Sequence, residues 1–230
     1  MREPQTTSST TSELVARSVA GCPSDSIALA VYAAVIARGE SAVTKQTLQA
    51  LRARGVTAIH AHEVTLQSYL FCGFPRMLDA LFDLVEVYDP REFIDEPARL
   101  DAASLAYTPA EADTIARDGL ALIRRIYGDS YARLESAITR ISPAVHRRIV
   151  LEGYGATLSR PQLDALTREL CVVTTLTYEW RPRQLRAHVR GAGNVGAAAD
   201  TIFAALEAIS AFTPIGHVNG ARRLVEEIVT

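Results

Sequence analysis

Residues 167–196, TRELCVVTTLTYEWRPRQLRAHVRGAGNVG, have a counterpart in residues 26–55, SIALAVYAAVIARGESAVTKQTLQALRARG. Both stretches have the pattern of an apolar helix, a short turn, a second helix and a final glycine. Each is followed by a helix with an aromatic-rich end, so that Phe71 and Phe212 fall at the same offset. Such a repeat predicts a helical unit that is used twice, with its two copies packed against each other.

Signals for helix starts recur along most of the remaining chain. Residues 108–111, TPAE, have the composition of a capping box with proline at the first helical position. Ser-Pro at 142–143 and Arg-Pro at 160–161 predict two further helix starts. Alternating Val, Ile and Thr, which are typical of strands, are absent. We therefore expect an all-α fold.

Polar and acidic stretches divide the chain. The start is rich in Ser and Thr, and an acidic segment between the repeats contains Pro90 and Pro97. The expected organisation is a disordered N-terminal tail (1–19), a degenerate first helical repeat (20–88), a linker (89–107) and a second helical repeat that carries the site (108–230).

Composition excludes several classes of protein. The chain has 230 residues, is 48% hydrophobic and 22% charged, and has a formal net charge of −2, as soluble globular proteins do. This balance favours neither nucleic acid nor an anionic membrane as a partner. No apolar run reaches the roughly 18 residues that span a bilayer. The N-terminus lacks the apolar region of a signal peptide, so we expect a cytoplasmic protein.

The three cysteines, Cys22, Cys72 and Cys171, lie far apart and form no C-x-x-C pair. This pattern indicates a reducing compartment, with no disulfide framework and no metal site.

The two repeats differ in the residue types that carry chemistry. A structural polar network has little reason to occur in one copy alone, so a single active site is expected in the second repeat. The second repeat has Glu169, Arg181, Gln184 and His188 where the first has Ala28, Glu40, Val43 and Thr47.

The spacing from Glu169 to His188 resembles the carboxymuconolactone decarboxylase and alkylhydroperoxidase D superfamily. The peroxidase branch of that superfamily has E-x11-C-x2-C-x3-H, and here Arg181 and Gln184 replace both cysteines. Peroxide reduction needs a thiolate and a resolving cysteine, so peroxidase activity is not expected.

The decarboxylase branch resembles more of the chain, in residues 153–170, GYGATLSRPQLDALTREL, and residues 184–196, QLRAHVRGAGNVG. The sequence departs from that branch at Gln184, where Glu is usual, and at Glu169, where a small residue is usual. The resemblance implies a tandem-repeat helical alkylhydroperoxidase D-like fold and a cofactor-free reaction. It also implies a homotrimer with pseudo-sixfold symmetry, for which the apolar faces of residues 69–82 and 201–212 are the expected interfaces.

Three residues are the catalytic candidates that this resemblance implies. His188 is the proton donor, since its unperturbed pKa lies near 6.5. Glu169 hydrogen-bonds His188 and keeps it protonated, and the amide of Gln184 faces the developing oxyanion. The alternatives are a hydrogen-bonded core histidine, an ion pair of Glu169 with Arg168 or with an arginine of a partner subunit, and a surface glutamine.

Four further residues are candidates for substrate binding. Arg181 or Arg160 would hold a carboxylate through its guanidinium fork, or Arg160 is simply a solvated loop residue. Trp180 and Tyr154 would wall the pocket, or they are ordinary core or interface aromatics.

The leading functional hypothesis is a lyase that decarboxylates a small unsaturated carboxy-lactone or related cyclic carboxylate. An isomerase or cyclase that uses the same site for proton transfer is the second. The third is a catalytically silent protein that binds a small ligand or acts in assembly.

Overall fold

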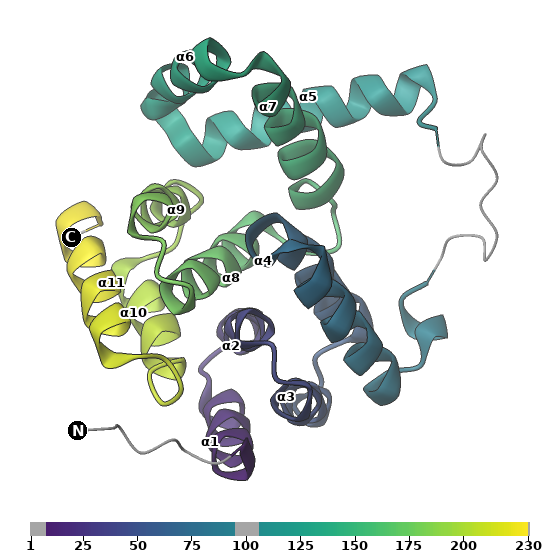
Figure 1. Cartoon of the computed structure of the whole chain (residues 1–230), viewed down its shortest axis with the longest axis vertical. Coiled ribbons are helices and arrows are strands. Elements are labelled where there is room, and N and C mark those ends of the chain that lie inside the picture. Colours follow the sequence, from purple (N-terminus) through teal and green to yellow (C-terminus); the bar gives the residue numbers. More distant parts are fainter. Residues whose placement is uncertain (1–7, 95–105, 230) are drawn as a thin grey trace.

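The computed structural model describes residues 8–94 and 106–229, and within these ranges the chain forms helices and no strands (Figure 1). The expected all-α class is confirmed. Before the gap lie α1 (Ser8–Gly21), α2 (Asp25–Arg38), α3 (Ser41–Arg54), α4 (Ala58–Val87) and the short turn η1 (Pro90–Glu92). After it lie α5 (Pro109–Tyr127), η2 (Gly128–Ser130), α6 (Tyr131–Ile141), α7 (Pro143–Arg148), η3 (Ile149–Leu158), α8 (Ala165–Tyr178), α9 (Pro182–Asn194), α10 (Ala199–Ala208) and α11 (Ile215–Ile228). In the described part of the chain, no helix has the length and apolar character needed to cross a membrane.

The first helices of the two repeats, α2 and α8, lie at the centre of the molecule (Figure 1). Every residue of 27–37 in α2 and of 167–177 in α8 is buried. A helix that is covered on all sides belongs to the interior of a domain. The contact between α2 and α8 is the most extensive one between described elements, as expected if the two copies pack against each other.

Equivalent positions of the two repeats also meet or match in conformation. The hydroxyls of Ser26 and Thr167, which hold the same position in their repeats, lie 2.7 Å apart. Such a contact between equivalent residues is expected close to a pseudo-twofold axis. Left-handed backbone recurs at two pairs of equivalent positions, Gly39 (φ 74°) with Trp180 (φ 49°) and Gly55 (φ 91°) with Gly196 (φ 106°).

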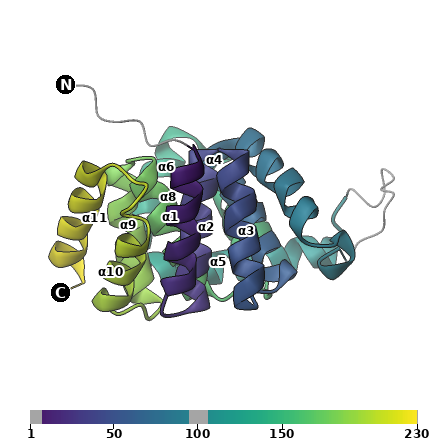
Figure 2. The same ribbon diagram turned by 90° about the horizontal axis from the view of Figure 1, so that it is seen from below.

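The expected disordered tail is wrong for residues 8–19, which belong to α1. The physical reason is a stripe of Thr11, Val15 and Val19 at a spacing of four residues, all buried. This stripe packs α1 against α3, and the two helices lie beside α2 (Figure 2). This stripe was missed in the sequence because the segment is otherwise rich in Ser and Thr. Residues 1–7 lie outside the described ranges.

Helix α4 is broken at Gly73, where φ is 80° and ψ is 163°. Pro75 follows in the next turn and suits the start of the second segment. The break sets residues 69–74 at an angle that lets them reach the second repeat. The expected linker begins as a turn over residues 89–94 whose Phe93 is buried, and residues 95–105 lie outside the described part.

Helices α5, α6 and α7 form a layer over one end of α8 and α9 (Figure 1). The helix expected to start at Ser142 is present, but its α-helical part ends at Arg148 and the wider π-helix η3 follows. The helix expected at Arg160 starts instead after Asp164, whose side chain accepts from the Thr167 N–H.

The two apolar faces that were expected to be interfaces differ in exposure. In residues 201–212 the large apolar side chains Ile202, Leu206, Ile209 and Phe212 are buried within the chain, so the expected second face is wrong. In α4, Phe74 is 57% exposed and Phe82 is 66% exposed, and Leu78 lies between them on the same face.

Candidate active site

Glu169 of α8 and His188 of α9 form a buried hydrogen-bonded pair. Oε2 of Glu169 lies 2.9 Å from Nδ1 of His188, and the two residues are 1% and 6% exposed. A carboxylate only accepts, so Nδ1 is the donor and carries a proton. Nε2 is then the ring nitrogen that a bound molecule can reach.

A glycine permits this close approach of the two helices. A Cβ atom on Gly191 would lie 2.7 Å from Oε2 of Glu169, inside van der Waals contact. Gly191 is one turn beyond His188 on the buried side of α9. The glycine-containing end of this helix is therefore part of what positions the pair.

The alternative partner of Glu169, Arg168, pairs with a different carboxylate. Its guanidinium donates to Glu63 Oε2 at 2.7 Å and to Gln67 Oε1 at 3.1 Å. The Glu169–Arg168 ion pair is thus not formed. Glu169 Oε1 is buried with no hydrogen-bond partner among the described residues.

His188 lies on the wall of a cavity of about 430 Å³. The other walls come from residues 69–74 of α4, Tyr127 at the end of α5, and residues 148–158. The rings of Phe71 and Tyr127 meet the imidazole edge-on, with centroids 5.7 and 6.3 Å away. The cavity is mainly aromatic, with the imidazole as its buried titratable group.

Two tyrosine hydroxyls add polar groups beside His188. Tyr127 and Tyr154 both line the cavity, and their rings meet edge-on with centroids 6.3 Å apart. Burial raises the pKa of each phenol above its ordinary value. Both hydroxyls therefore stay protonated near neutral pH and are available as donors. The sequence-based assignment of Tyr154 as a wall residue agrees with this placement.

Gln184 is not brought to the cavity. It lies in the first turn of α9, and its side chain is exposed. Leu185 occupies the buried position of that turn, on the stripe that continues through Val189 and Ala192. The spacing of four residues from His188 was correct, but the first turn of α9 extends beyond the walls of the cavity, so the expected role of Gln184 is not supported.

Three other candidates also lie away from this cavity. Arg181 is exposed and lies 3.5 Å from Glu179. Trp180 stacks on His217 at 5.2 Å. Arg160 forms an ion pair with Glu63 at 2.9 Å and lines two other cavities. Each of these side chains makes a contact of its own, which the spacing of a motif does not reveal.

Sequence reasoning missed Tyr127, Phe71, and the charged pair Arg148 and Glu152 on the cavity wall. These residues come from α4, α5 and the consecutive elements α7 and η3, and they meet only through the packing of α4 and α5 against η3. The repeat did single out Phe71 by its offset, although not as a neighbour of His188.

No group of three or more His, Cys, Asp or Glu side chains in residues 8–94 and 106–229 is placed to hold a metal ion. No model of a known protein family matches the chain. A comparison with curated proteins found no match either.

Proposed function

We propose that this chain is a cofactor-free lyase that decarboxylates a small unsaturated carboxy-lactone or related cyclic carboxylate. The observation that carries the proposal is the buried Glu169–His188 pair on the wall of an aromatic cavity. The resemblance of residues 153–170 and 184–196 to the decarboxylase branch selects this reaction among those that an acid–base group performs.

Each step of the reaction has a group in the cavity. Cleavage of the carbon–carbon bond releases carbon dioxide and leaves its electron pair delocalised onto the carbonyl oxygen as a dienolate. The hydroxyls of Tyr127 and Tyr154 take the oxyanion-stabilising role that was expected of Gln184. Imidazolium at His188 then transfers its Nε2 proton to carbon, and solvent restores that proton.

Glu169 keeps the imidazole in the productive orientation and stabilises its charged form. Arg148 lines the same cavity and replaces Arg181 as the cation for the reacting carboxylate. Because many of the wall side chains are aromatic or aliphatic, electrostatic interactions with a substrate bound at His188 are stronger than in bulk water.

Peroxide reduction does not fit the thiols. Burial raises the pKa of Cys72 to about 12 and that of Cys22 to about 11, and it raises that of Cys171 as well. Protonated thiols are poor nucleophiles. None of the three is among the described residues that line the His188 cavity.

An isomerase or cyclase is the second candidate, and the exposure of Arg148 favours it. An exposed cation holds a carboxylate weakly, whereas proton transfer alone needs only His188, Glu169 and the tyrosine hydroxyls. Decarboxylation remains the first candidate because the sequence resemblance points to it.

The test is to incubate the purified protein with carboxy-lactones in deuterium oxide and to measure carbon dioxide release and deuterium incorporation together. His188→Ala should reduce turnover by about 10²-fold or more, the usual scale for a general acid. His217→Ala is the control histidine variant, since the half-buried His217 stacks on Trp180, away from the cavity.

Deuterium exchange without carbon dioxide would replace the lyase with the isomerase. Binding without either signal would identify a silent ligand-binding protein. Full activity in His188→Ala would remove the proposed site.

A further inference from the structure

Three cavities follow one another along the face between α4 and η3. The His188 cavity shares Tyr69 and Phe74 with a second cavity of about 460 Å³. That cavity shares Ala156 and Arg160 with a third one of about 510 Å³. Because consecutive cavities have wall residues in common, they lie next to one another from His188 to Arg160, and we refer to the three together as the groove.

The Glu63, Arg160 and Arg168 side chains at the Arg160 end of the groove form a cluster with one net positive charge, and the carboxylates of Glu111 and Asp118 line the same cavity as Arg160. Nε of Arg160 donates to both carboxylate oxygens of Glu63, at 2.9 and 3.2 Å. Arg168 donates to the same carboxylate. Two guanidinium groups therefore share a single buried carboxylate. Arg168 is 2% exposed at its side chain and Arg160 is 30% exposed, so the uncompensated charge faces the groove through Arg160.

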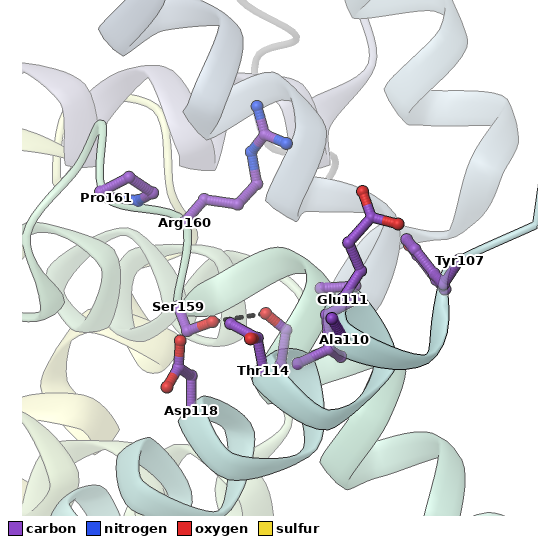
Figure 3. A pocket seen from close by; sticks show the side chains of 11 residues that line it. Tyr107, Ala110, Glu111, Thr114, Asp118, Ser159, Arg160 and Pro161 are labelled. Carbon is purple, nitrogen blue, oxygen red and sulfur yellow. Dashed lines mark hydrogen bonds between the residues drawn. The ribbon is translucent and has the colours of Figure 1, made fainter. Parts of the chain in front are cut away.

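The acidic side chains near Arg160 are already engaged. Oε2 of Glu111 accepts from both the N–H and the hydroxyl of Thr108. Asp118 pairs with Arg117 at 2.9 Å. Figure 3 shows Arg160 and Glu111 extending to the same side of the third cavity from two different segments. A ligand anion thus has a free guanidinium edge to bind at this end.

The middle of the groove is apolar on one side and acidic on the other. Leu66, Met77 and Phe93 line the second cavity, together with Glu152 at its junction with the His188 cavity. Apolar walls favour a hydrocarbon chain. Glu152 repels an anion placed halfway, so that an anionic group is directed past the junction to Arg160.

We propose that the substrate is elongated, with its reacting ring at His188 and an apolar arm that ends in a carboxylate bound by Arg160. This inference rests on the proposed function, because the reacting ring is assigned by the Glu169–His188 pair. It gives Arg160 a role in binding the far end of the substrate and makes the long groove a determinant of chain length.

The test uses calorimetric binding of ω-phenylalkanoates, from phenylacetate to phenyloctanoate, to the purified chain. Affinity should rise by up to about fourfold per methylene and pass through a maximum when the carboxylate reaches Arg160. At that length the acid should bind about tenfold more tightly than the corresponding alcohol. Arg160→Gln should abolish this preference and Arg160→Lys should retain part of it, while Arg140→Gln, at an exposed position of α6 that lines none of these cavities, should leave it intact.

A second variant tests the groove without altering any charge. Ala156→Leu narrows the wall that the second and third cavities share, so it should weaken long probes and leave phenylacetate unchanged. Ala53→Leu, at an exposed position of α3 away from the groove, should have no effect. Circular dichroism should be native for Arg160→Gln, because Glu63 keeps its bond to Arg168.

An acid preference that persists in Arg160→Gln, or equal affinity for all chain lengths, would overturn the elongated substrate. Neither readout requires turnover. A length optimum without carbon dioxide release would therefore refute the proposed decarboxylase and support the elongated substrate. Carbon dioxide release without a length optimum would support the decarboxylase and refute the elongated substrate.

Discussion

Gly191 lies beneath the carboxylate of Glu169, and its missing side chain sets how closely α8 and α9 approach. Besides Oε2 of Glu169, an added Cβ would lie 2.7 Å from Cγ2 of Ile126. Ile126 is buried in the neighbouring helix α5 and Glu169 in α8, so neither neighbour can move freely. The geometry of the Glu169–His188 pair therefore depends on a residue that has no chemistry of its own.

Gly191→Ala should consequently reduce turnover by about tenfold or more, because small displacements of a catalytic group are costly. The Nδ1–H signal of His188 should also shift in nitrogen-15 NMR spectra. Gly193→Ala is the control: its Cβ would meet only Val229 side-chain atoms at 3.8 Å, and alanine favours a helix. An unchanged His188 signal in Gly191→Ala would contradict this account of the pair.

At this scale the sequence predicted the partners of one hydrogen bond and missed most of the wall around them. The spacing of Glu169 and His188 was enough to predict their hydrogen bond, because the two residues lie on the consecutive helices α8 and α9. The expected role of Gln184 was not supported. A spacing of four residues predicts that Gln184 and His188 share one face of the helix, but it does not predict where the neighbouring elements end. Phe71 and Tyr127 required knowledge of long-range packing.

Helix α5 and the π-helix η3 touch through their backbones. Gly119 faces the carbonyl of Val150, and Gly155 faces the carbonyl of Ile115, so two glycines on opposite elements remove the side chains that would separate them. This contact fixes the position of Tyr154, the residue before Gly155 in η3, in the wall of the His188 cavity.

Gly155→Ala should therefore destabilise the fold by about 1–3 kcal/mol, the usual cost of overpacking, and the lowered midpoint should be visible in thermal unfolding. Gly216→Ala in α11 is the matched control, since an added Cβ there meets nothing within 4 Å. Its stability should stay the same or rise slightly. Equal midpoints for both variants would show that the α5–η3 contact can relax at little cost.

The ends of the helices show which structural features can be predicted from neighbouring residues. The capping box of Thr108 and Glu111 and the N-cap at Ser142 are both present, since caps depend on neighbouring residues. The π-helix was not predicted, because a wider turn is selected by packing against α5 and leaves no local composition signal. Helix α1 was missed because polar residues dominate its first turns.

At the scale of the whole molecule, the two repeats form a symmetric centre, in which α2 packs against α8, but their outer surfaces differ. In residues 201–212 the side chains of Ile202, Leu206, Ile209 and Phe212 are buried within the chain, while residues 74–85 of α4 carry exposed apolar side chains. Phe74, Leu78, Phe82 and Val85 form the α4 stripe, at intervals of four, four and three residues along one face, and all are at least 40% exposed. Repeat matching predicted the pairing of α2 with α8, but it gave no means of telling which outer face stays open.

We propose that the α4 stripe is the surface through which three copies associate, since contiguous exposed apolar side chains usually mark an interface and cyclic closure is common. Light scattering after size exclusion should give a mass near three chains of 25.0 kDa. Phe82→Asp should convert this species to single chains, because a carboxylate would be buried unpaired. Ile215→Asp is matched in exposure, at 66% like Phe82, but lies on α11 and should leave the mass unchanged. A wild-type mass of one chain would refute the assembly, and dissociation by Ile215→Asp alone would move the interface to α11.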